Sequence, residues 1–225
     1  MSASYLNKDG EDRSAVPIGA LRRFMQEREQ ARTSVEHCEL CSEVIPANHH
    51  HLLDLSSRTL ICACQACSVL FNDQGAGGGK YRLVPRRYLA LLDFRMSDEL
   101  WDEMMIPVNM VYIFQSTFAN RIMAFYPSPA GAMESLLDLE NWESLTGNNP
   151  ILNNLEPDVE ALLINRVKDV REYYIVPIDA CYKLIGLIRV YWKGLSGGEE
   201  VWKEIAEFFA DIQAKSEPMR GEPDA

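Results

Sequence analysis

The sequence predicts an α+β protein in which a small N-terminal cysteine module precedes a larger domain of mixed helices and strands. Four cysteines stand in two Cys-x-x-Cys pairs in the first third of the chain. The region from 81 to 214 then alternates between helix-like and strand-like apolar patterns. A glycine-rich stretch at 75–80 separates the two regions, so we expect a flexible hinge there.

The remaining segments follow from composition and periodicity. Residues 1–16 and 215–225 are polar and have no apolar periodicity, which predicts disordered tails. Residues 17–74 are predicted to hold an amphipathic helix over 17–32 and then the metal-binding module, with Pro17 suited to the first helical turn. The α+β domain takes up residues 81–214, and 225 residues in all are enough to bury a substantial core.

Charge and hydropathy restrict the classes of function. The formal net charge of −11 argues against nucleic acid as a partner, because such binding depends on clustered Lys and Arg. The apolar stretch at 104–114 is too short for a membrane span, which needs about 20 residues. The first 14 residues lack the apolar segment of a secretion signal. We therefore expect a cytoplasmic protein without membrane insertion. In the reducing cytoplasm, clustered cysteines are more often metal ligands than disulfides.

The two cysteine pairs predict a metal site. Cys38 and Cys41 form the first pair, Cys64 and Cys67 form the second, and residues 42–63 lie between them. Two such turns can fold back on one ion and supply the four sulfurs of a tetrahedral site. Structural zinc (Zn2+) is the expected occupant. Iron (Fe) is the alternative, because its ligand set would be identical.

The segment between the pairs predicts a β-hairpin. Strands are expected at 51–55 and 59–62, and the second cysteine pair begins a short helix at 66–72. This order of turn, hairpin and cysteine-bearing helix resembles the zinc-ribbon and treble-clef families. The helix N-terminus would favour the thiolate forms of Cys64 and Cys67.

Four residues near the pairs have roles that the sequence leaves open. Cys62 can substitute for Cys64 as a ligand, although the spacing favours Cys64, and we expect Cys62 to be a neighbouring thiol. Metal exchange or redox sensing are the alternatives for it. The consecutive His49, His50 and His51 alternate faces on an extended strand, so they cannot all reach one ion. Solvent exposure is expected for them, and a place in or beside the metal site is the alternative.

Local patterns predict the elements of the larger domain. Strands are expected at 108–117, 122–126, 173–177 and 181–192, with partial helix as the alternative for the last. Helices are expected from Ser97 onward and at 132–145, 158–166 and 199–214. Cys181 is expected in the hydrophobic core. All four histidines lie near the cysteines, so a Ser-His-Asp arrangement in this domain would have no base, and no enzymatic activity is expected.

Three stretches together resemble a known family. They are the Arg22-Arg23-Phe24 helix with the cysteine pairs that follow it, the segment 155–166, and the segment 187–202. The chain resembles an uncharacterised bacterial family encoded beside uptake nickel–iron (NiFe) hydrogenase genes. The resemblance implies a cytoplasmic accessory role in hydrogenase maturation or assembly, with hydrogenase subunits or maturation factors as protein partners. It implies no catalytic residues.

The predicted function is therefore that of a non-enzymatic, metal-binding hydrogenase accessory protein that works through protein–protein contacts. A rubredoxin-like iron–thiolate electron carrier for the same system is the first alternative, and a zinc-ribbon regulatory protein is the second. After the cysteines, the segment 189–202 is the next candidate contact surface, because Trp192 and Trp202 flank its glycines. A tight turn between two core tryptophans is the simpler explanation of that segment.

Overall fold

The computed structural model describes residues 35–104, 106, 108–135 and 139–220. It confirms the α+β class, since two separate sheets combine with helices. The described residues from His37 onward belong to one compact unit. The helix predicted at 17–32 and the tail at 1–16 lie outside the described residues. Among the helices described, none has the length and apolar character needed to cross a membrane.

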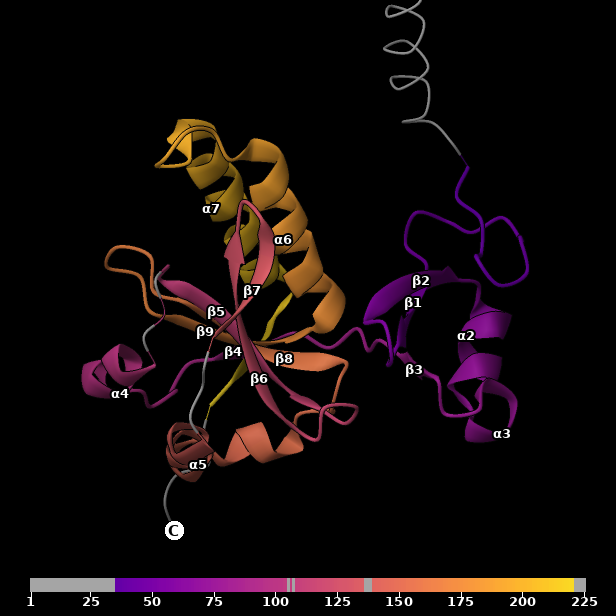
Figure 1. Cartoon of the computed structure of the whole chain (residues 1–225), viewed down its shortest axis with the longest axis horizontal. Coiled ribbons are helices and arrows are strands. Elements are labelled where there is room, and N and C mark those ends of the chain that lie inside the picture. Colours follow the sequence, from indigo (N-terminus) through magenta and orange to yellow (C-terminus); the bar gives the residue numbers. More distant parts are fainter. Residues whose placement is uncertain (1–34, 105, 107, 136–138, 221–225) are drawn as a thin grey trace, which may run out of the picture. The chain divides into compact units, whose positions relative to one another are not determined.

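The cysteine module is a three-stranded antiparallel sheet with a helix packed on it (Figure 1). Its elements are β1 (His50–Asp54), β2 (Thr59–Ala63), α2 (Gln65–Asn72), α3 (Gln74–Gly77) and β3 (Tyr81–Leu83). Strand β1 is central, between β2 and β3. The predicted hairpin and the helix after it are thus present, and no end of these elements differs from its predicted position by more than one residue.

The glycine-rich stretch at 75–80 lies inside this module. It forms α3 and the turn that leads into β3, and β3 pairs with β1 from Leu52↔Leu83 to Asp54↔Tyr81. Gly78 has a φ of 61°, a left-handed conformation that glycine adopts at little cost. The structure therefore differs from the predicted hinge, because a three-residue strand that pairs with a distant partner leaves no periodic pattern in the sequence.

The larger domain is built on a seven-stranded sheet of order β10-β4-β9-β8-β5-β6-β7. Its strands are β4 (Leu89–Leu91), β5 (Met110–Ser116), β6 (Arg121–Ser128), β7 (Gly131–Ser135), β8 (Glu160–Asn165), β9 (Glu172–Pro177) and β10 (Glu217–Met219). Neighbouring strands are antiparallel except for β10 and β4, which are parallel. The segment predicted as a disordered tail at 215–225 thus contributes an edge strand at its start.

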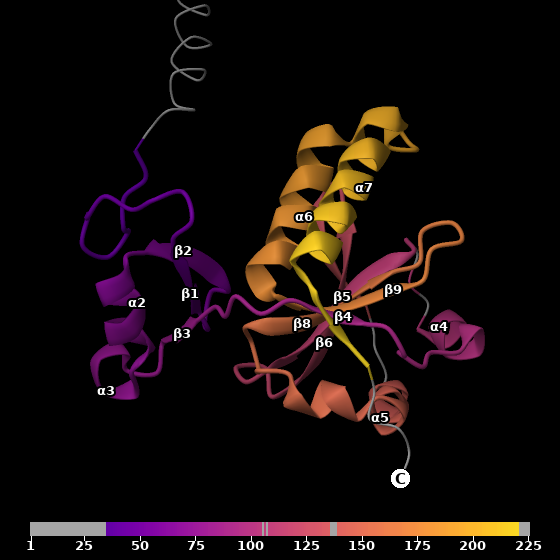
Figure 2. The ribbon, with the colours of Figure 1, turned by 180° about the vertical axis from the view of Figure 1, so that it is seen from behind.

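Helices cover both faces of this sheet (Figures 1 and 2). On one face α6 (Ile178–Tyr191) and α7 (Gly198–Lys215) pack against side chains such as Leu163 of β8. The other face carries α4 (Asp98–Glu103), α5 (Leu139–Asn148) and the 3-10 turn η2 (Pro150–Asn154), which pack around Leu162 and Ile164. Successive residues of β8 therefore enter two different cores, as strand geometry requires.

Three predicted elements of this domain are wrong. The helix predicted at 158–166 is strand β8, which is buried along its whole length and so reads as a continuous apolar run. The strand predicted at 181–192 is helix α6, although partial helix was allowed for. The helix predicted at 132–145 is strand β7 in its first part and α5 in its last part. Short apolar runs do not distinguish a buried strand from a buried helix.

Two buried carboxylates of the larger domain bind arginines from the module and the chain that leaves it. Asp158 is 3.1 Å from Arg82 of β3, and the Thr117 hydroxyl and amide also donate to it. Glu160 has a side chain that is only 1% exposed, and Arg87 donates to it twice, at 2.9 and 2.6 Å. These ion pairs join the module to the central strands of the larger sheet.

The Arg87–Glu160 pair generates a stability prediction. The change Arg87→Met leaves the Glu160 carboxylate buried without its cation, and breaking a buried pair in this way is costly. We expect a loss of about 3 kcal/mol in the free energy of unfolding, the low end of the usual range, because Arg87 itself is partly exposed. Urea denaturation provides the measurement.

The matched control is Lys203→Met. Lys203 pairs with Glu207 at 3.5 Å on the surface of α7, where such i,i+4 pairs contribute about 0.3–0.5 kcal/mol. Equal losses for the two variants would contradict the expected contribution of the buried Arg87–Glu160 pair to stability.

Candidate metal centre

The four cysteines of the two pairs lie together at one end of the module. Cys38 and Cys41 belong to a turn before β1, while Cys64 and Cys67 belong to the start of α2. Their sulfur atoms all lie within 4.8 Å of one another. The sulfurs of Cys41 and Cys64 are 3.7 Å apart. A tetrahedron with zinc–sulfur bonds of about 2.3 Å has edges of about 3.8 Å, so the group is close enough to hold one metal ion.

Local hydrogen bonds explain how each pair is shaped. In the first turn, the amide of Cys38 donates to Glu43 and the amide of Ser42 donates back to Cys38, at 2.7 and 2.8 Å. In the second, Cys64 is the N-cap of α2, and its sulfur accepts a hydrogen bond from the Cys67 amide at 3.4 Å. Both pairs are thus held in shape by hydrogen bonds from backbone amides.

A second set of hydrogen bonds ties the two pairs to each other. The amide of Glu39 donates to the carbonyl of Cys62 at 2.9 Å, and the carboxylate of Glu39 accepts from the Cys62 amide at 2.6 Å. Glu39, one of the two residues between the ligands of the first turn, therefore fixes that turn against the end of β2, where the second pair begins.

The sulfurs form part of a very small hydrophobic core. The module's cluster has five buried residues, namely Cys38, Ile45, Leu52, Ala63 and Cys67. Two of these five are predicted metal ligands. A core of this size contributes little stability, and small metal domains compensate by coupling their folding to metal binding.

The pKa values of two thiols in the group, Cys38 and Cys67, shift in opposite directions. Burial would raise the pKa of the Cys38 thiol, but hydrogen bonds from backbone amides, that of Cys64 foremost, lower it to about 6. The pKa of Cys67 is raised, first by burial and then by the neighbouring sulfurs. Negative charge on one sulfur thus disfavours charge on the next. A bound cation would remove this conflict and allow all four to be thiolates.

The other candidate ligands near the pairs lie elsewhere in the module. Cys62 is not part of the four-sulfur group, and instead lies with His49 and His51 within 4.8 Å. His50 points away from them and is hydrogen-bonded to Gln65 at 2.6 Å. All three histidines are half-buried, so the expectation that they are solvent-exposed is wrong. Cys181 is fully buried in the core of the larger domain, as predicted.

The segment 189–202 forms the turn between α6 and α7. The indole N–H groups of Trp192 and Trp202 donate to carbonyls of this turn at 3.0 and 3.1 Å, and the two rings are 6.2 Å apart. Gly197 has a φ of 87°, and an added Cβ would lie 2.8 Å from a neighbouring side chain, so only glycine fits there. The tight turn of the simpler explanation is therefore present, although both tryptophans are half-buried against the core rather than inside it. Leu195 at its tip is fully exposed.

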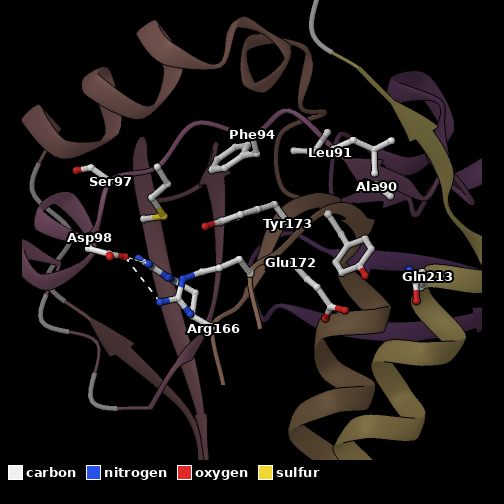
Figure 3. A pocket seen from close by; sticks show the side chains of 13 residues that line it. Ala90, Leu91, Phe94, Ser97, Asp98, Arg166, Glu172, Tyr173 and Gln213 are labelled. Atoms are coloured by element: carbon white, nitrogen blue, oxygen red, sulfur yellow. Dashed lines mark hydrogen bonds and ion pairs between the residues drawn. The ribbon is translucent and has the colours of Figure 1, made fainter. Parts of the chain in front are cut away.

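A pocket of about 630 Å³ in the larger domain was not predicted from the sequence (Figure 3). Arg166 forms an ion pair with Asp98 at one wall, and the stacked rings of Phe94 and Tyr173 form another, 4.4 Å apart. The Arg166 side chain is 3% exposed, and two of its nitrogens have no hydrogen-bond partner among the residues described. The pocket combines a buried ion pair with two aromatic faces, and its lining carries both acidic and basic side chains.

The sequence did not indicate this pocket, because residues 158–166 were predicted to be a helix that ends at Arg166. In the structure Arg166 directly follows β8, and its backbone amide donates to Asn109 at 2.7 Å. Only the pairing of β8 with β9 brings Arg166 next to Tyr173, so no local pattern could have indicated it.

Comparisons with known proteins give one match. The family described as "Family of unknown function (DUF5947)" matches residues 37–216, which include the whole cysteine module and nearly all of the larger domain. No curated protein matches the chain, and no solved structure matches it.

The geometry of the four sulfurs predicts the effect of removing one. The variant Cys38→Ser replaces a buried thiolate by a hydroxyl, a poor zinc ligand, so we expect it to lose about one tightly held metal ion per chain. Elemental analysis after dialysis, together with X-ray absorption to identify metal bound by sulfur alone, provides the measurement.

The control for this variant is Cys181→Ala, which removes an equally buried sulfur from α6 and should leave the metal content unchanged. Equal metal content in Cys38→Ser and the unmodified chain would contradict the assignment of these four ligands.

Proposed function

Because the chain belongs to the DUF5947 family of unknown function, its role must be argued from the site, and we propose a non-enzymatic metal-binding accessory protein. In this proposal the metal centre holds a small module in shape, and the module contacts a protein partner. We further propose that the partner is a hydrogenase subunit or a maturation factor, and that the protein supports NiFe hydrogenase maturation or assembly in the cytoplasm.

The observation that carries the proposal is the grouping of four cysteine sulfurs within 4.8 Å. A site with four protein ligands is closed, because no coordination position is left for water or substrate. This arrangement supports a structural metal. Zinc suits it best, since zinc prefers tetrahedral thiolate sites and has no redox chemistry of its own.

Exposed apolar side chains on the module support a role in protein contacts. Val69 and Leu70 on α2 are 61% and 53% exposed, and Val44 in the loop after the first cysteine pair is 56% exposed. The same helix carries Cys67, whose buried sulfur would be fixed by the metal. The metal would thus hold α2 so that Val69 and Leu70 face outward as anchors for a partner.

Support for the hydrogenase part of the proposal comes from the sequence. The three stretches at 22–67, 155–166 and 187–202 resemble a family encoded beside uptake hydrogenase genes. The net charge of −11 fits a protein partner better than nucleic acid. Partner capture can test this part without reference to the metal.

Iron in the same four-sulfur site would favour the electron-carrier alternative. Phe71 and Tyr81 pack beside the cysteine cluster, with ring centroids 6.1 Å apart, so aromatic side chains do adjoin the site. Ferric tetrathiolate absorbs visible light and zinc does not. The visible spectrum of protein purified without oxygen therefore separates the two functions.

The partner-contact proposal is tested by the double variant Val69→Glu with Leu70→Glu. Both side chains are exposed, so the change should leave folding and metal content intact. We expect it to reduce co-purification with hydrogenase subunits at least tenfold, because buried charge at an interface core is strongly unfavourable. Quantitative affinity capture from cells that express the hydrogenase is the measurement.

The matched control is Phe118→Glu, which places the same charge at a 66% exposed aromatic residue in the turn between β5 and β6. It should leave co-purification unchanged. The proposal would be overturned if the unmodified chain captured no hydrogenase subunit or maturation factor, or if the double variant captured as much as the control.

A further inference from the structure

A second cluster of metal-ligand side chains lies on the other face of the module's sheet. Strands β1 and β2 pair so that His51 is directly opposite Cys62, which places both side chains on the same face. His49 precedes His51 by two residues and shares that face, whereas His50 lies on the opposite face. The strand register therefore selects His49, His51 and Cys62 and excludes His50.

The three side chains are close enough for one ion. One ligand atom from each lies within 4.8 Å of the others. The His49 and His51 rings have centroids 4.8 Å apart and are nearly perpendicular, at 82°. This cluster shares no residue with the four-sulfur group.

A carboxylate from the larger domain orients one of these histidines. Nδ1 of His51 donates to Asp179 in the first turn of α6, at 2.8 Å. This hydrogen bond fixes the tautomer in which Nε2 is the unprotonated nitrogen. Histidines that bind metals almost always have such a carboxylate or carbonyl partner on the other ring nitrogen, which also raises their basicity.

The same carboxylate has an unsatisfied atom. Oδ1 of Asp179 is buried and has no hydrogen-bond partner among the residues described. A buried carboxylate oxygen without a partner is unfavourable, and nearby positive charge or a metal-bound water molecule would compensate it. This observation is independent of the ligand spacing and supports a cation, or a water molecule bound to it, beside Asp179.

From this arrangement we propose that His49, His51 and Cys62 form a second metal site, which binds one divalent transition metal ion of the zinc class. Two imidazoles and one thiolate suit zinc and its neighbours and do not suit magnesium or calcium, which prefer oxygen ligands. Asp179 is a positioning residue that acts through His51.

The second site differs from the first in its coordination. Three protein ligands leave one position of a tetrahedral ion open, which a water molecule or a ligand from another molecule can take. The metal there is exchangeable, whereas four cysteines enclose the first. The protein thus has one metal that shapes the module and one that is accessible beside α6.

The test is metal analysis of the full chain, produced without a histidine tag, saturated with Zn2+ and then dialysed against metal-free buffer. Two zinc ions per chain are expected, with X-ray absorption showing both sulfur and imidazole nitrogen ligands. The variant His51→Ala should retain one zinc ion with sulfur ligands alone. The control variant His50→Ala, on the opposite face of the same strand, should retain two.

A second variant distinguishes metal binding from simple packing of the module on α6. The change Asp179→Asn keeps an acceptor for His51 but removes the negative charge that holds the His51 ring in its orientation. Loss of such a partner lowers metal affinity about 10–100-fold. Zn2+ titration against a chelator of known affinity should show this loss for the second ion only. A packing contact would leave the affinity unchanged.

The proposal is overturned if the saturated, unmodified chain holds one zinc ion with sulfur ligands alone, or if His51→Ala still holds two. It does not rest on the proposed function.

Discussion

The structure of the module depends on the close approach of four cysteine sulfurs. They lie within 4.8 Å of one another, and two of them belong to a core of only five buried residues. Thiolates at this distance repel one another unless a cation lies between them. We infer that the metal takes the place of the missing hydrophobic core. Through Arg82 and Arg87, which bind buried carboxylates next to and on β8, the module is in turn joined to the larger sheet.

The elements whose signals come from residues close together in the chain could be predicted from the sequence. The spacing of the cysteines indicated the four-sulfur group, and the strand patterns at 51–55 and 59–62 indicated the hairpin between the pairs. Ser97 was predicted to begin a helix, and its hydroxyl does accept from the Leu100 amide at the start of α4. The apolar stripe of 199–214 indicated α7, whose buried positions recur at helical intervals. Each of these signals involves residues close together in the chain.

Features that depend on pairing between distant strands could not be predicted. β8 is buried on both faces, so its apolar run resembles a helix, and that error hid Arg166 and the pocket beside it. β3 and β10 have three residues each and exist because a distant strand pairs with them. The grouping of His49 and His51 with Cys62 needs the register of β1 on β2, and its link to Asp179 needs the packing of α6.

The most direct test of this account is amide hydrogen exchange of the full chain before and after metal removal by a chelator. If the metal substitutes for a core, β1, β2 and α2 lose protection on metal removal, while β5, β8 and β9 keep most of theirs. Unchanged protection in the module after complete metal removal would contradict it, because the module would then be stable without the ion.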